Sequence, residues 1–332
     1  MIDIFKNKIW KIIEAGYAYR KWNILKKKAK IKEDEYLFVE YKAIGDSFLS
    51  FCMAKEFKKN HPNRQYSVAI SSKMVPIAKW FSDIDRIIEV NEKDLVLFVN
   101  SPFSLYIGWK HIKSGDLNLG HPRVLFKLAG VSNFNYFHLL NMQKGQEWGS
   151  KFLGPDRVNE KIKNRVYNEL SQKGIKRDKG IFLIPSAVSS DSNLYKNFFS
   201  KLIQYLILDK EFENYYFVVN EMSNYFDQSL GNKVIYKRPS LEEAYFYATY
   251  LGNVISVRTG LADFLSATNV NMLVLYKDSF FGESKMKLKD FYSLKHINLG
   301  ANIEEVELSF DDEQEILKVI SIFKNLINTK DK

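Results

Sequence analysis

Short apolar runs alternate with stretches of helical periodicity along most of the chain, and this alternation predicts an α/β protein. In the first half, unbroken runs of β-branched and aromatic residues predict strands, and apolar residues that return every three or four positions predict helices. Strands that alternate with helices are typical of a parallel sheet with crossover connections. The predicted strands are 36–41, 66–70, 85–90 and 95–99, the predicted helices are 47–59 and 74–81, and 42–46 is the turn after the first strand.

The second half repeats this pattern after a polar stretch from residue 143 to residue 179. Ser240 followed three residues later by Glu243 is the signature of a helix that begins with a capping box. Two α/β halves with a cleft between them are therefore the predicted architecture. The strands predicted in the second half are 180–185, 215–219, 233–236, 254–257 and 271–276, and the helices are 195–208, the segment that begins at Ser240, and 311–327.

Shifts in composition and charge predict the boundaries between these parts. A basic amphipathic arm is followed by an N-terminal α/β domain, a linker with a helix of its own, a C-terminal α/β domain and a closing helix. The corresponding ranges are 1–34, 35–155, 156–179, 180–310 and 311–332.

Cysteine content and hydropathy restrict the compartment. Cys52 is the one cysteine, so no internal disulfide can form, and no signal-peptide pattern opens the chain. A reducing, cytoplasmic setting is expected. No run approaches the roughly 18 apolar residues that a membrane span requires, so we expect a protein that does not cross a bilayer.

The positive charge is concentrated at the N-terminus. The formal net charge is +10, and residues 1–32 contain ten lysines and arginines against Asp3 and Glu14. This segment therefore carries most of the excess, and the remaining 300 or so residues are close to neutral.

The same segment has the pattern of an amphipathic helix. Ile2, Phe5, Ile9, Ile12 and Ile13 recur at helical spacing among the basic residues. Such a helix suits the surface of an anionic membrane. The alternative is a helix that packs on the body of the protein with its lysines in water. Nucleic acid is a poorer partner, because a deep apolar stripe interleaves with the charges and the body has no matching basic surface.

One turn in the second half predicts an anion site. The apolar run 254–257 breaks at Arg258-Thr259-Gly260 and passes directly into an apolar helical segment. A strand that turns straight into a helix directs backbone N–H groups at one spot, which favours a phosphate or diphosphate. Arg258 adds a positive charge beside it.

The first half has a turn in the corresponding place, Ile44-Gly45-Asp46. Gly45 permits close approach of the backbone, and Asp46 can accept a proton or orient a hydroxyl. An acid at a helix N-terminus is also favourable by about 0.3–1 kcal/mol without any catalytic role. Because both turns follow strands of parallel sheets, we expect both to face the shared cleft.

The chain resembles the heptosyltransferase-like (family 9) bacterial glycosyltransferases. In the N-terminal half, the resemblance rests on a first strand followed by Ile-Gly-Asp, an apolar helix, His-Pro-Asn, a strand, and Phe-Ser-Asp-Ile-Asp-Arg-Ile-Ile, within 36–90. In the C-terminal half, it rests on a strand that ends in proline and small residues, a Ser-Leu-x-Glu helix, and an apolar strand into Thr-Gly-Leu. The resemblance implies a GT-B fold, with two Rossmann-like domains and a nucleotide-sugar donor held mainly by the second.

The resemblance also implies roles for individual residues. Asp46 would be the general base of an inverting transfer. Arg258, on account of its own charge and not of the resemblance, is expected to join it in catalysis by stabilising the leaving diphosphate. Lys42, Gly45 and His121 would lie on the acceptor side. The residues expected to bind the donor and its phosphates are Ser186, Ser189, Glu243, Arg258, Thr259 and Gly260. For Glu243, a role as a helix cap explains the residue equally well.

Three departures from the family leave the donor sugar open. The family has an aspartate before Thr-Gly and a histidine three residues after that glycine, where this chain has Arg258 and Asp263. We expect Asp263 to face the donor sugar. A Lys-Arg-Trp-Pro phrase is also replaced, here by Leu-Tyr-Lys-Asn, in which Lys196 is either a phosphate ligand or a solvated helix residue.

Metals and cofactors are not expected. Asp83-Ile-Asp85 matches a metal-binding Asp-x-Asp on its letters, but it stands at a predicted loop-to-strand junction. The histidines lack the spacing of a zinc site. The chain has no Gly-x-Gly-x-x-Gly, no P-loop and no catalytic triad, which argues against dehydrogenases, ATPases and hydrolases.

The sequence therefore predicts a metal-independent glycosyltransferase of bacterial surface-polysaccharide synthesis, for example of lipopolysaccharide or capsule. Its predicted partners are a nucleotide-diphosphate sugar, a glycan or lipid-linked acceptor, and an anionic membrane surface bound through residues 1–32, with no nucleic acid. The predicted location is the inner face of the plasma membrane. The alternatives are a catalytically silent protein of this fold that binds a glycan or partner, and a nucleotide-sugar epimerase.

Overall fold

The chain divides into two compact units in a computed structural model. Unit 1 contains Met1–Trp148 and Pro155–Arg157, and unit 2 contains Gly149–Gly154 and Val158–Lys332. The structure describes residues 2–32, 35–39, 44–45, 47–48, 51–52, 54, 58, 62–100, 119–120, 155–186, 192–222, 225–226, 230–279, 287, 289, 293–297 and 302–328.

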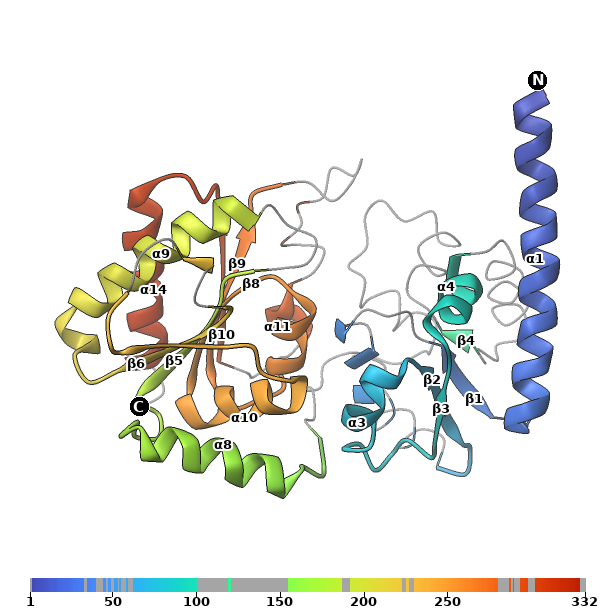
Figure 1. Ribbon diagram of the computed structural model, residues 1–332, viewed down its shortest axis with the longest axis horizontal. Coiled ribbons are helices and arrows are strands. Elements are labelled where there is room, and N and C mark those ends of the chain that lie inside the picture. The colour runs from blue at the N-terminus through green and yellow to red at the C-terminus, as the bar shows by residue number, and fades with distance from the viewer. Residues whose placement is uncertain are drawn as a thin grey trace. The chain divides into compact units, whose positions relative to one another are not determined.

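Unit 1 is built on a parallel sheet with the strand order β3-β2-β1-β4 (Figure 1). All five residues of β2 are buried, as expected for a strand between helices. The predicted strands at 36, 66 and 85 are confirmed. The strands are β1 (Tyr36–Val39), β2 (Tyr66–Ile70), β3 (Arg86–Glu89) and β4 (Leu119–Gly120), and the short helices after β2 are η1 (Ser72–Met74) and α3 (Val75–Ala78).

The prediction of a strand at 95–99 is wrong, because this segment belongs to α4 (Glu92–Asn100). The Asn91 side chain accepts a hydrogen bond from the Lys93 amide at 2.8 Å, which starts the helix, and acids lie in its first turn. Leu95 and Phe98, three residues apart, are buried on one face. A short apolar run without its caps is ambiguous between strand and helix, and the cap at Asn91 decides it.

The predicted helix after β1 begins earlier than expected. Ile44 and Gly45, predicted in a turn, are already helical, and every described residue from 44 to 58 is helical. The helix packs on unit 1 through Phe48 and Phe51, whose rings lie 5.9 and 5.6 Å from that of Phe81.

The N-terminal segment forms one long helix, α1 (Ile2–Ala29). Its C-terminal half packs against β3 and α4 in a small core that includes Ala18, Trp22, Ile88 and Phe98. Its N-terminal end runs past the other labelled elements of unit 1 (Figure 1). Among the helices that the structure describes, none combines the length and apolarity that crossing a membrane requires.

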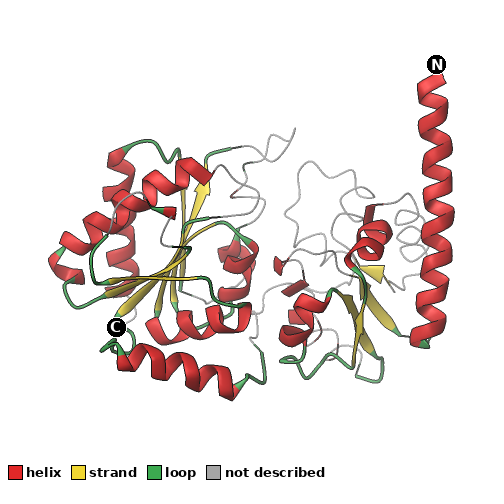
Figure 2. Cartoon of the chain, viewed as in Figure 1, coloured by secondary structure: helices red, strands yellow, loops and turns green. Residues whose placement is uncertain are grey.

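Unit 2 is a six-stranded parallel sheet with the order β10-β9-β8-β5-β6-β7. Helices cover both faces (Figure 2). The strands are β5 (Gly180–Ile184), β6 (Tyr216–Asn220), β7 (Val234–Lys237), β8 (Asn253–Val257), β9 (Asn271–Lys277) and β10 (Ile303–Leu308). The helices are α8 (Glu160–Gln172), α9 (Ser192–Leu208), η2 (Lys210–Phe212), α10 (Leu241–Leu251), α11 (Gly260–Leu265), α13 (Leu294–Ile297) and α14 (Glu313–Asn328).

Alternate residues of the central strands point to opposite faces of this sheet, and both faces are buried. Ile181 and Leu183 of β5 belong to the core that α9 and α14 cover. Phe182, between them, stacks on Tyr247 of α10 with a ring separation of 6.1 Å. Near-continuous apolar runs are typical of strands buried on both faces, which is why β5, β8 and β9 were predictable.

β10 is a strand that the predictions missed. Its sequence alternates apolar residues with Glu304, Glu305 and Glu307. Glutamate is disfavoured in strands, and the alternation suits an edge strand, where one side of the chain remains accessible. Its pairing with β9 over six residues supplies the register that its own sequence does not indicate.

Caps at both ends of α10 set the start of β8. The predicted capping box is confirmed, since the Ser240 hydroxyl accepts from the Glu243 amide and the Glu243 carboxylate accepts from the Ser240 amide. Gly252 ends the helix with a φ of 79°. A Cβ there would lie 3.0 Å from the Cα of Asp178, so only glycine fits.

Asparagine side chains join the strands at the amino edge of the same sheet. The Asn253 amide donates to the carbonyl of Gly180 at 3.0 Å, and Asn271 donates to Asn253 at 2.8 Å. Asn302 donates in turn to Asn271 and to the carbonyl of Leu326. This asparagine ladder links β5, β8 and β9, the start of β10 and the end of α14.

Candidate functional site

The direction of the chain reverses across the sheet of unit 2 between β5 and β8. From β5 the chain builds β6 and β7 on one side, and it then returns to build β8, β9 and β10 on the other. Ligands of open α/β sheets bind at the carboxyl ends of the strands at such a reversal. Ser186 follows β5 there, and Arg258-Thr259-Gly260 follows β8.

The turn after β8 has the predicted geometry. Thr259 is the N-cap of α11, and its hydroxyl accepts from the Ala262 amide at 3.1 Å. The amide of Arg258 still belongs to the sheet, since it donates to the carbonyl of Leu275 at 2.9 Å. Gly260 is the first residue of the helix. The leading amides of a helix have no carbonyl four residues before them, so this turn can offer N–H groups to an anion.

Arg258 and Asp263, predicted for phosphate and for the donor sugar, contact each other. The guanidinium lies 2.6 Å from the carboxylate, and the two side chains are 12% and 6% exposed. A second nitrogen of Arg258 donates to the carbonyl of Thr259 at 2.8 Å. The two residues therefore place a nearly buried ion pair against the first turn of α11, in place of the unpaired positive charge that the sequence suggested.

Tyr276 supports this pair from β9. The side chain is fully buried, and its hydroxyl donates to Glu305 of β10 at 2.7 Å. Burial raises the pKa of Tyr276 well above its usual value; Arg258 opposes this shift, and Glu305 and Asp263 add to it. Tyr276 therefore stays a neutral hydrogen-bond donor beside the ion pair.

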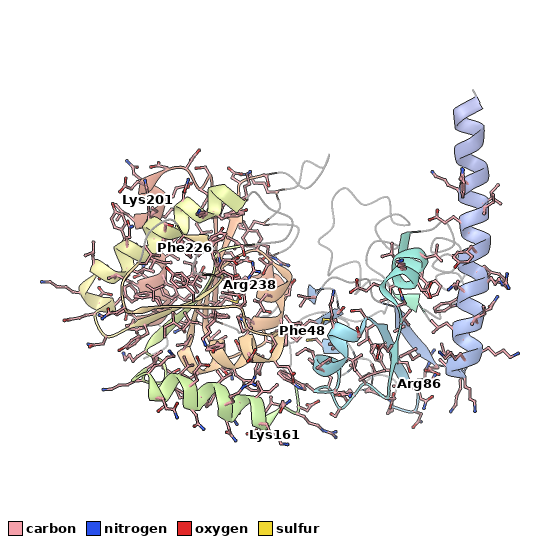
Figure 3. The ribbon with its side chains drawn as sticks, viewed as in Figure 1. Phe48, Arg86, Lys161, Lys201, Phe226 and Arg238 are labelled. Carbon is pink, nitrogen blue, oxygen red and sulfur yellow. The ribbon has the colours of Figure 1, made fainter. Side chains whose placement is uncertain are left out.

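A second polar group occupies the carboxyl ends of β5, β6 and β7. Glu221, with a side chain 8% exposed, accepts from the Ser186 hydroxyl at 3.0 Å and from two nitrogens of Arg238 at 3.0 and 2.6 Å. Arg238 itself is largely exposed (Figure 3). Burial, with a smaller contribution from Glu221, raises the pKa of Tyr225 to about 12.

This cluster brings a predicted residue, Ser186, together with two that the predictions missed. Glu221 directly follows the apolar run of β6, and Arg238 directly follows β7. The rule that selected Ser186 and Arg258, a polar residue at the carboxyl end of a parallel strand, would have selected both.

Glu243 lies at the N-terminus of α10, where its carboxylate takes part in the capping box and pairs with Arg165 of α8 at 2.6 Å. These contacts account for the residue by its structural role. Its predicted contact with a nucleotide stays a prediction.

The acceptor side can be placed only in part. Gly45 is helical and buried. Asp46, Lys42 and His121 of the N-terminal half, and Ser189 of the C-terminal half, lie outside the described residues, so their roles stay predictions.

Asp85, from the Asp-x-Asp sequence, has structural partners. Its carboxylate accepts from the Tyr66 amide at 2.6 Å and lies 2.5 Å from the Lys58 ammonium. Both contacts join the segment before β3 to neighbouring elements of unit 1, as expected for a loop-to-strand junction.

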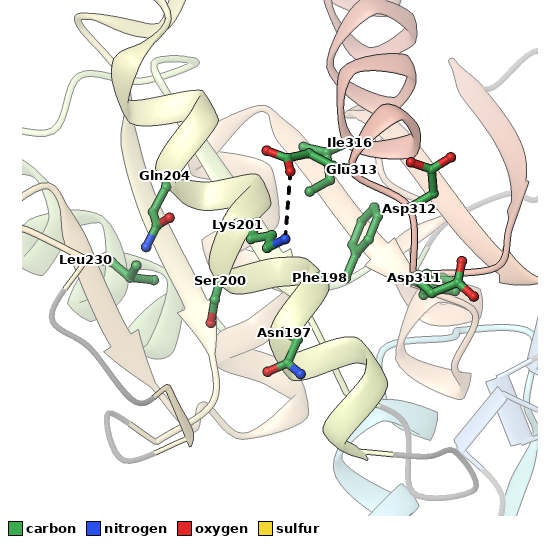
Figure 4. Close-up of a pocket in the computed structure, with 11 residues that line it drawn as sticks. Asn197, Phe198, Ser200, Lys201, Gln204, Leu230, Asp311, Asp312, Glu313 and Ile316 are labelled. Carbon is green, nitrogen blue, oxygen red and sulfur yellow. Dashed lines mark ion pairs between the residues drawn. The ribbon is translucent and has the colours of Figure 1, made fainter.

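A cavity of about 580 Å³ lies elsewhere in unit 2, between α9 and α14 (Figure 4). Its charged lining is Lys201 against Asp311, Asp312 and Glu313. Asp312 accepts from the Gln314 amide at 2.9 Å, and Glu313 accepts from the Tyr205 hydroxyl. Its excess of carboxylates disfavours a phosphate, so the cavity is a poorer donor site than the turn after β8.

Several solved structures have a similar fold. No family model matches the chain, and a comparison with curated proteins gives no match. A family 9 glycosyl transferase from Veillonella parvula is 14% identical, with a TM-score of 0.60 over 90% of this chain and 98% of that one. The ADP-heptose lipopolysaccharide heptosyltransferase II of E. coli is also 14% identical, with a TM-score of 0.56 over 90% and 100%.

The E. coli heptosyltransferase WaaC, solved with ADP, is 12% identical, with a TM-score of 0.53 over 88% of this chain and 99% of that one. The three matches span nearly the whole length of both partners. The chain therefore has a heptosyltransferase-like GT-B fold, as the sequence resemblance implied.

Proposed function

We propose that this protein is a glycosyltransferase that moves a sugar from a nucleotide-diphosphate donor to a hydroxyl of a glycan or lipid-linked acceptor in bacterial surface-polysaccharide synthesis. The observation that carries the proposal is the fold shared with glycosyl transferases along about nine-tenths of the chain. The turn at Thr259 and Gly260, at the reversal point of the unit 2 sheet, supports it.

The proposed donor is a nucleoside diphosphate sugar, and the proposal does not specify which sugar it carries. One of the similar structures contains ADP and another is of an ADP-heptose enzyme. This chain has Arg258 and Asp263 at two positions where the family differs, and the two form an ion pair here. Since that pair borders the proposed diphosphate site, the proposal does not extend to heptose.

In the proposed reaction, Asp46 accepts the proton of the acceptor hydroxyl, whose oxygen attacks the anomeric carbon with inversion. The bond from that carbon to the diphosphate oxygen breaks, and the nucleoside diphosphate leaves. The amides that open α11 stabilise the charge of the leaving group. The Arg258 guanidinium adds a bidentate donor for phosphate. The amides, together with Arg258 once a phosphate displaces Asp263 from it, would stabilise the leaving group, so the proposed mechanism requires no metal ion.

The loops after β5, β6 and β7 are proposed to bind the nucleoside end of the donor. Glu221 can accept from sugar or base donors at the end of β6, and Ser186 lies between it and the turn after β8. Glu243 belongs to the same proposal, and Ser186 and Ser189 are proposed to hydrogen-bond phosphate oxygens of the donor.

The location belongs to the proposal as well. We place the protein on the inner face of the plasma membrane, bound peripherally to anionic lipid through residues 1–32. A lipid-linked acceptor would then be presented at the surface to which the enzyme binds.

A panel of nucleotide sugars tests the activity, with and without glycan or lipid-linked acceptors. The expected result is acceptor-dependent release of one nucleoside diphosphate. Release of nothing across the panel, with nucleotide binding intact, would support the silent binding protein, and conversion of the donor without acceptor would support an epimerase.

Asp46→Asn tests the base. General-base catalysis contributes about 10²–10⁴-fold, so we expect a loss of turnover in that range with nucleotide affinity unchanged. Glu89→Gln, at an exposed acid of the same unit, is the matched control. Normal turnover of Asp46→Asn would remove this residue from the mechanism.

A further inference from the structure

Large apolar side chains are exposed on α1 more than anywhere else in the part of the chain that the structure describes. Trp10 is 69% exposed, Ile12 71% and Ile13 55%, and Tyr17, Tyr19 and Ile24 are more than half exposed. Outside α1, exposed large apolar residues occur singly, as at Leu208 and Leu317. Scattered residues of this kind are ordinary on a protein surface, but a cluster on one helix marks an interaction surface.

The C-terminal half of α1 already has its partner. Ala18 and Trp22 are buried against unit 1, and the Trp22 ring packs edge-on against Phe98 at 5.4 Å. Lys21 lies 3.4 Å from Asp94 of α4. Ala18 and Trp22 therefore face the rest of unit 1, whereas Tyr17, Tyr19 and Ile24 of the same half are exposed.

The end of α1 is fixed in direction by its cap. Lys30 adopts a φ of 49°, and the amides of Lys30 and Ile31 donate to the carbonyls of Lys27 and Lys26, which is the Schellman arrangement. The carbonyl of Ala29 accepts from Arg86 of β3 at 2.5 Å.

Arg86 is itself held by a buried carboxylate. Arg86, labelled in Figure 3, makes a bidentate pair with Glu35. The Glu35 side chain is fully buried and also accepts from the Ser67 hydroxyl. A side chain bound on two sides by fixed partners cannot swing, so α1 is mounted rigidly on the sheet of unit 1.

The exposed apolar residues lie on the opposite side of α1 from the packed ones. At 3.6 residues per turn, successive residues are roughly 100° apart. Ile12 and Ile24 are therefore about 120° around the helix from Ala18, and Ile13 is about 140° away. The helix has two apolar faces, one turned to unit 1 and one turned to solvent, and no single apolar stripe runs along its length.

Charge decides which partner fits the outer face. Residues 1–32 carry ten basic residues and two acidic ones. A second copy of this helix would bring the same positive charge, whereas the headgroups of an anionic bilayer bring the opposite charge. Tryptophan and tyrosine are the residues that favour the boundary between headgroups and acyl chains.

We infer that the outer face of α1, made by Trp10, Ile12, Ile13 and Tyr17, binds the headgroup layer of an anionic membrane while the inner face fixes unit 1 to the helix. This inference rests on the membrane binding in the proposed function. It adds which face of α1 binds the membrane and how α1 is attached to the sheet of unit 1. A rigid mount means that lipid binding holds the N-terminal unit itself at the bilayer, instead of tethering it on a flexible arm.

Co-sedimentation of the full-length protein with vesicles tests the inference. The vesicles are phosphatidylcholine alone, and phosphatidylcholine with phosphatidylglycerol. The protein should bind the second kind and not the first, and binding should weaken as salt is raised. Ile12→Ser/Ile13→Ser should weaken it by about tenfold or more, because two interfacial side chains are lost. The variant should unfold in urea like the unaltered protein, since both side chains are more than half exposed.

Leu208→Ser/Leu317→Ser is the matched control, because it removes two exposed apolar residues outside α1 and should bind vesicles normally. Equal vesicle binding by all three proteins would overturn the inference. So would a concentration-dependent dimer that Ile12→Ser/Ile13→Ser abolishes, because the face would then belong to a second copy. Neither donor nor acceptor enters this experiment, so its failure leaves the proposed transfer reaction standing.

Discussion

The contact between Arg258 and Asp263 changes the roles that the sequence predicted for these two residues. Each was assigned separately from the sequence, one to phosphate and one to the donor sugar. In the structure they neutralise each other at 2.6 Å. A phosphate that binds Arg258 must compete with Asp263 for the guanidinium, so the pair can tune the affinity for the donor.

Arg258→Ala should lower the free energy of unfolding by about 3–5 kcal/mol, because Asp263 would remain nearly buried without its counter-charge. The double variant Arg258→Met/Asp263→Leu should recover most of this loss. Urea unfolding measures both. Lys295→Ala, which removes an exposed partner of Glu304, should cost no more than about 1 kcal/mol.

The same Arg258→Ala protein tests the phosphate site by calorimetry with nucleoside diphosphates. A loss of affinity is expected, because one bidentate phosphate donor is removed. An affinity equal to that of the unaltered protein would mean that Arg258 stabilises the fold and does not bind the donor.

The turn at Thr259 was predictable because cap, glycine and strand are adjacent in sequence. The Glu221–Arg238 contact was not, since its partners are 17 residues apart and meet only when β6 and β7 pair. The Arg258–Asp263 contact was missed for another reason. Each residue was assigned a contact with the donor, and a contact between the two side chains was not considered.

Elements were predictable where local chemistry and burial agree. The capping box of α10 and the apolar runs of β5, β8 and β9 are examples. The prediction failed at α4, where five apolar-rich residues look like a strand unless Asn91 is recognised as a cap. It also missed β10, whose glutamates are tolerated because the strand lies at the edge of the sheet.

The Glu169 carboxylate joins α8 to the rest of unit 2, and its negative charge contributes to the stability of the fold. Glu169 lies 2.6 Å from Lys237 of β7 and accepts from the Tyr247 hydroxyl of α10 at 2.9 Å. Burial alone would raise the pKa of Glu169, but the hydrogen bonds from Lys237 and Tyr247 outweigh it and lower the pKa.

A folded-state pKa below that of the unfolded chain gives stability that is present above about pH 4.5 and is lost as pH falls through the folded value. Glu169→Gln should therefore be less stable than the unaltered protein at pH 7, by about 1 kcal/mol. The difference should shrink toward pH 4. Thermal unfolding at the two pH values measures it, and Glu160→Gln, at an exposed acid of the same helix, is the control variant.

At the scale of the whole molecule, each unit has a core of its own. The core of unit 2 combines residues of all six strands with α9 and α14, and none of its members lies before residue 181. A unit with a complete sheet and its own core is expected to fold alone.

Residues 149–332 expressed alone should therefore unfold cooperatively in urea and bind nucleoside diphosphates. Circular dichroism and calorimetry check the two properties. A fragment without a cooperative transition would show that unit 2 depends on unit 1 for its fold. A folded fragment without nucleotide affinity would instead place essential donor contacts in the first 148 residues.

The two edges of the unit 2 sheet have different roles. The asparagine ladder joins the strands at the amino edge, and the proposed donor site lies at the carboxyl edge. The ladder is at the amino edge, and strands of five to seven residues separate it from the turn after β8. At about 3.3 Å per residue the separation is on the order of 17–23 Å. Substitutions that far apart have independent, additive effects on stability. Residues at the carboxyl edge can thus change with the substrate without weakening the asparagine contacts that join the strands at the amino edge.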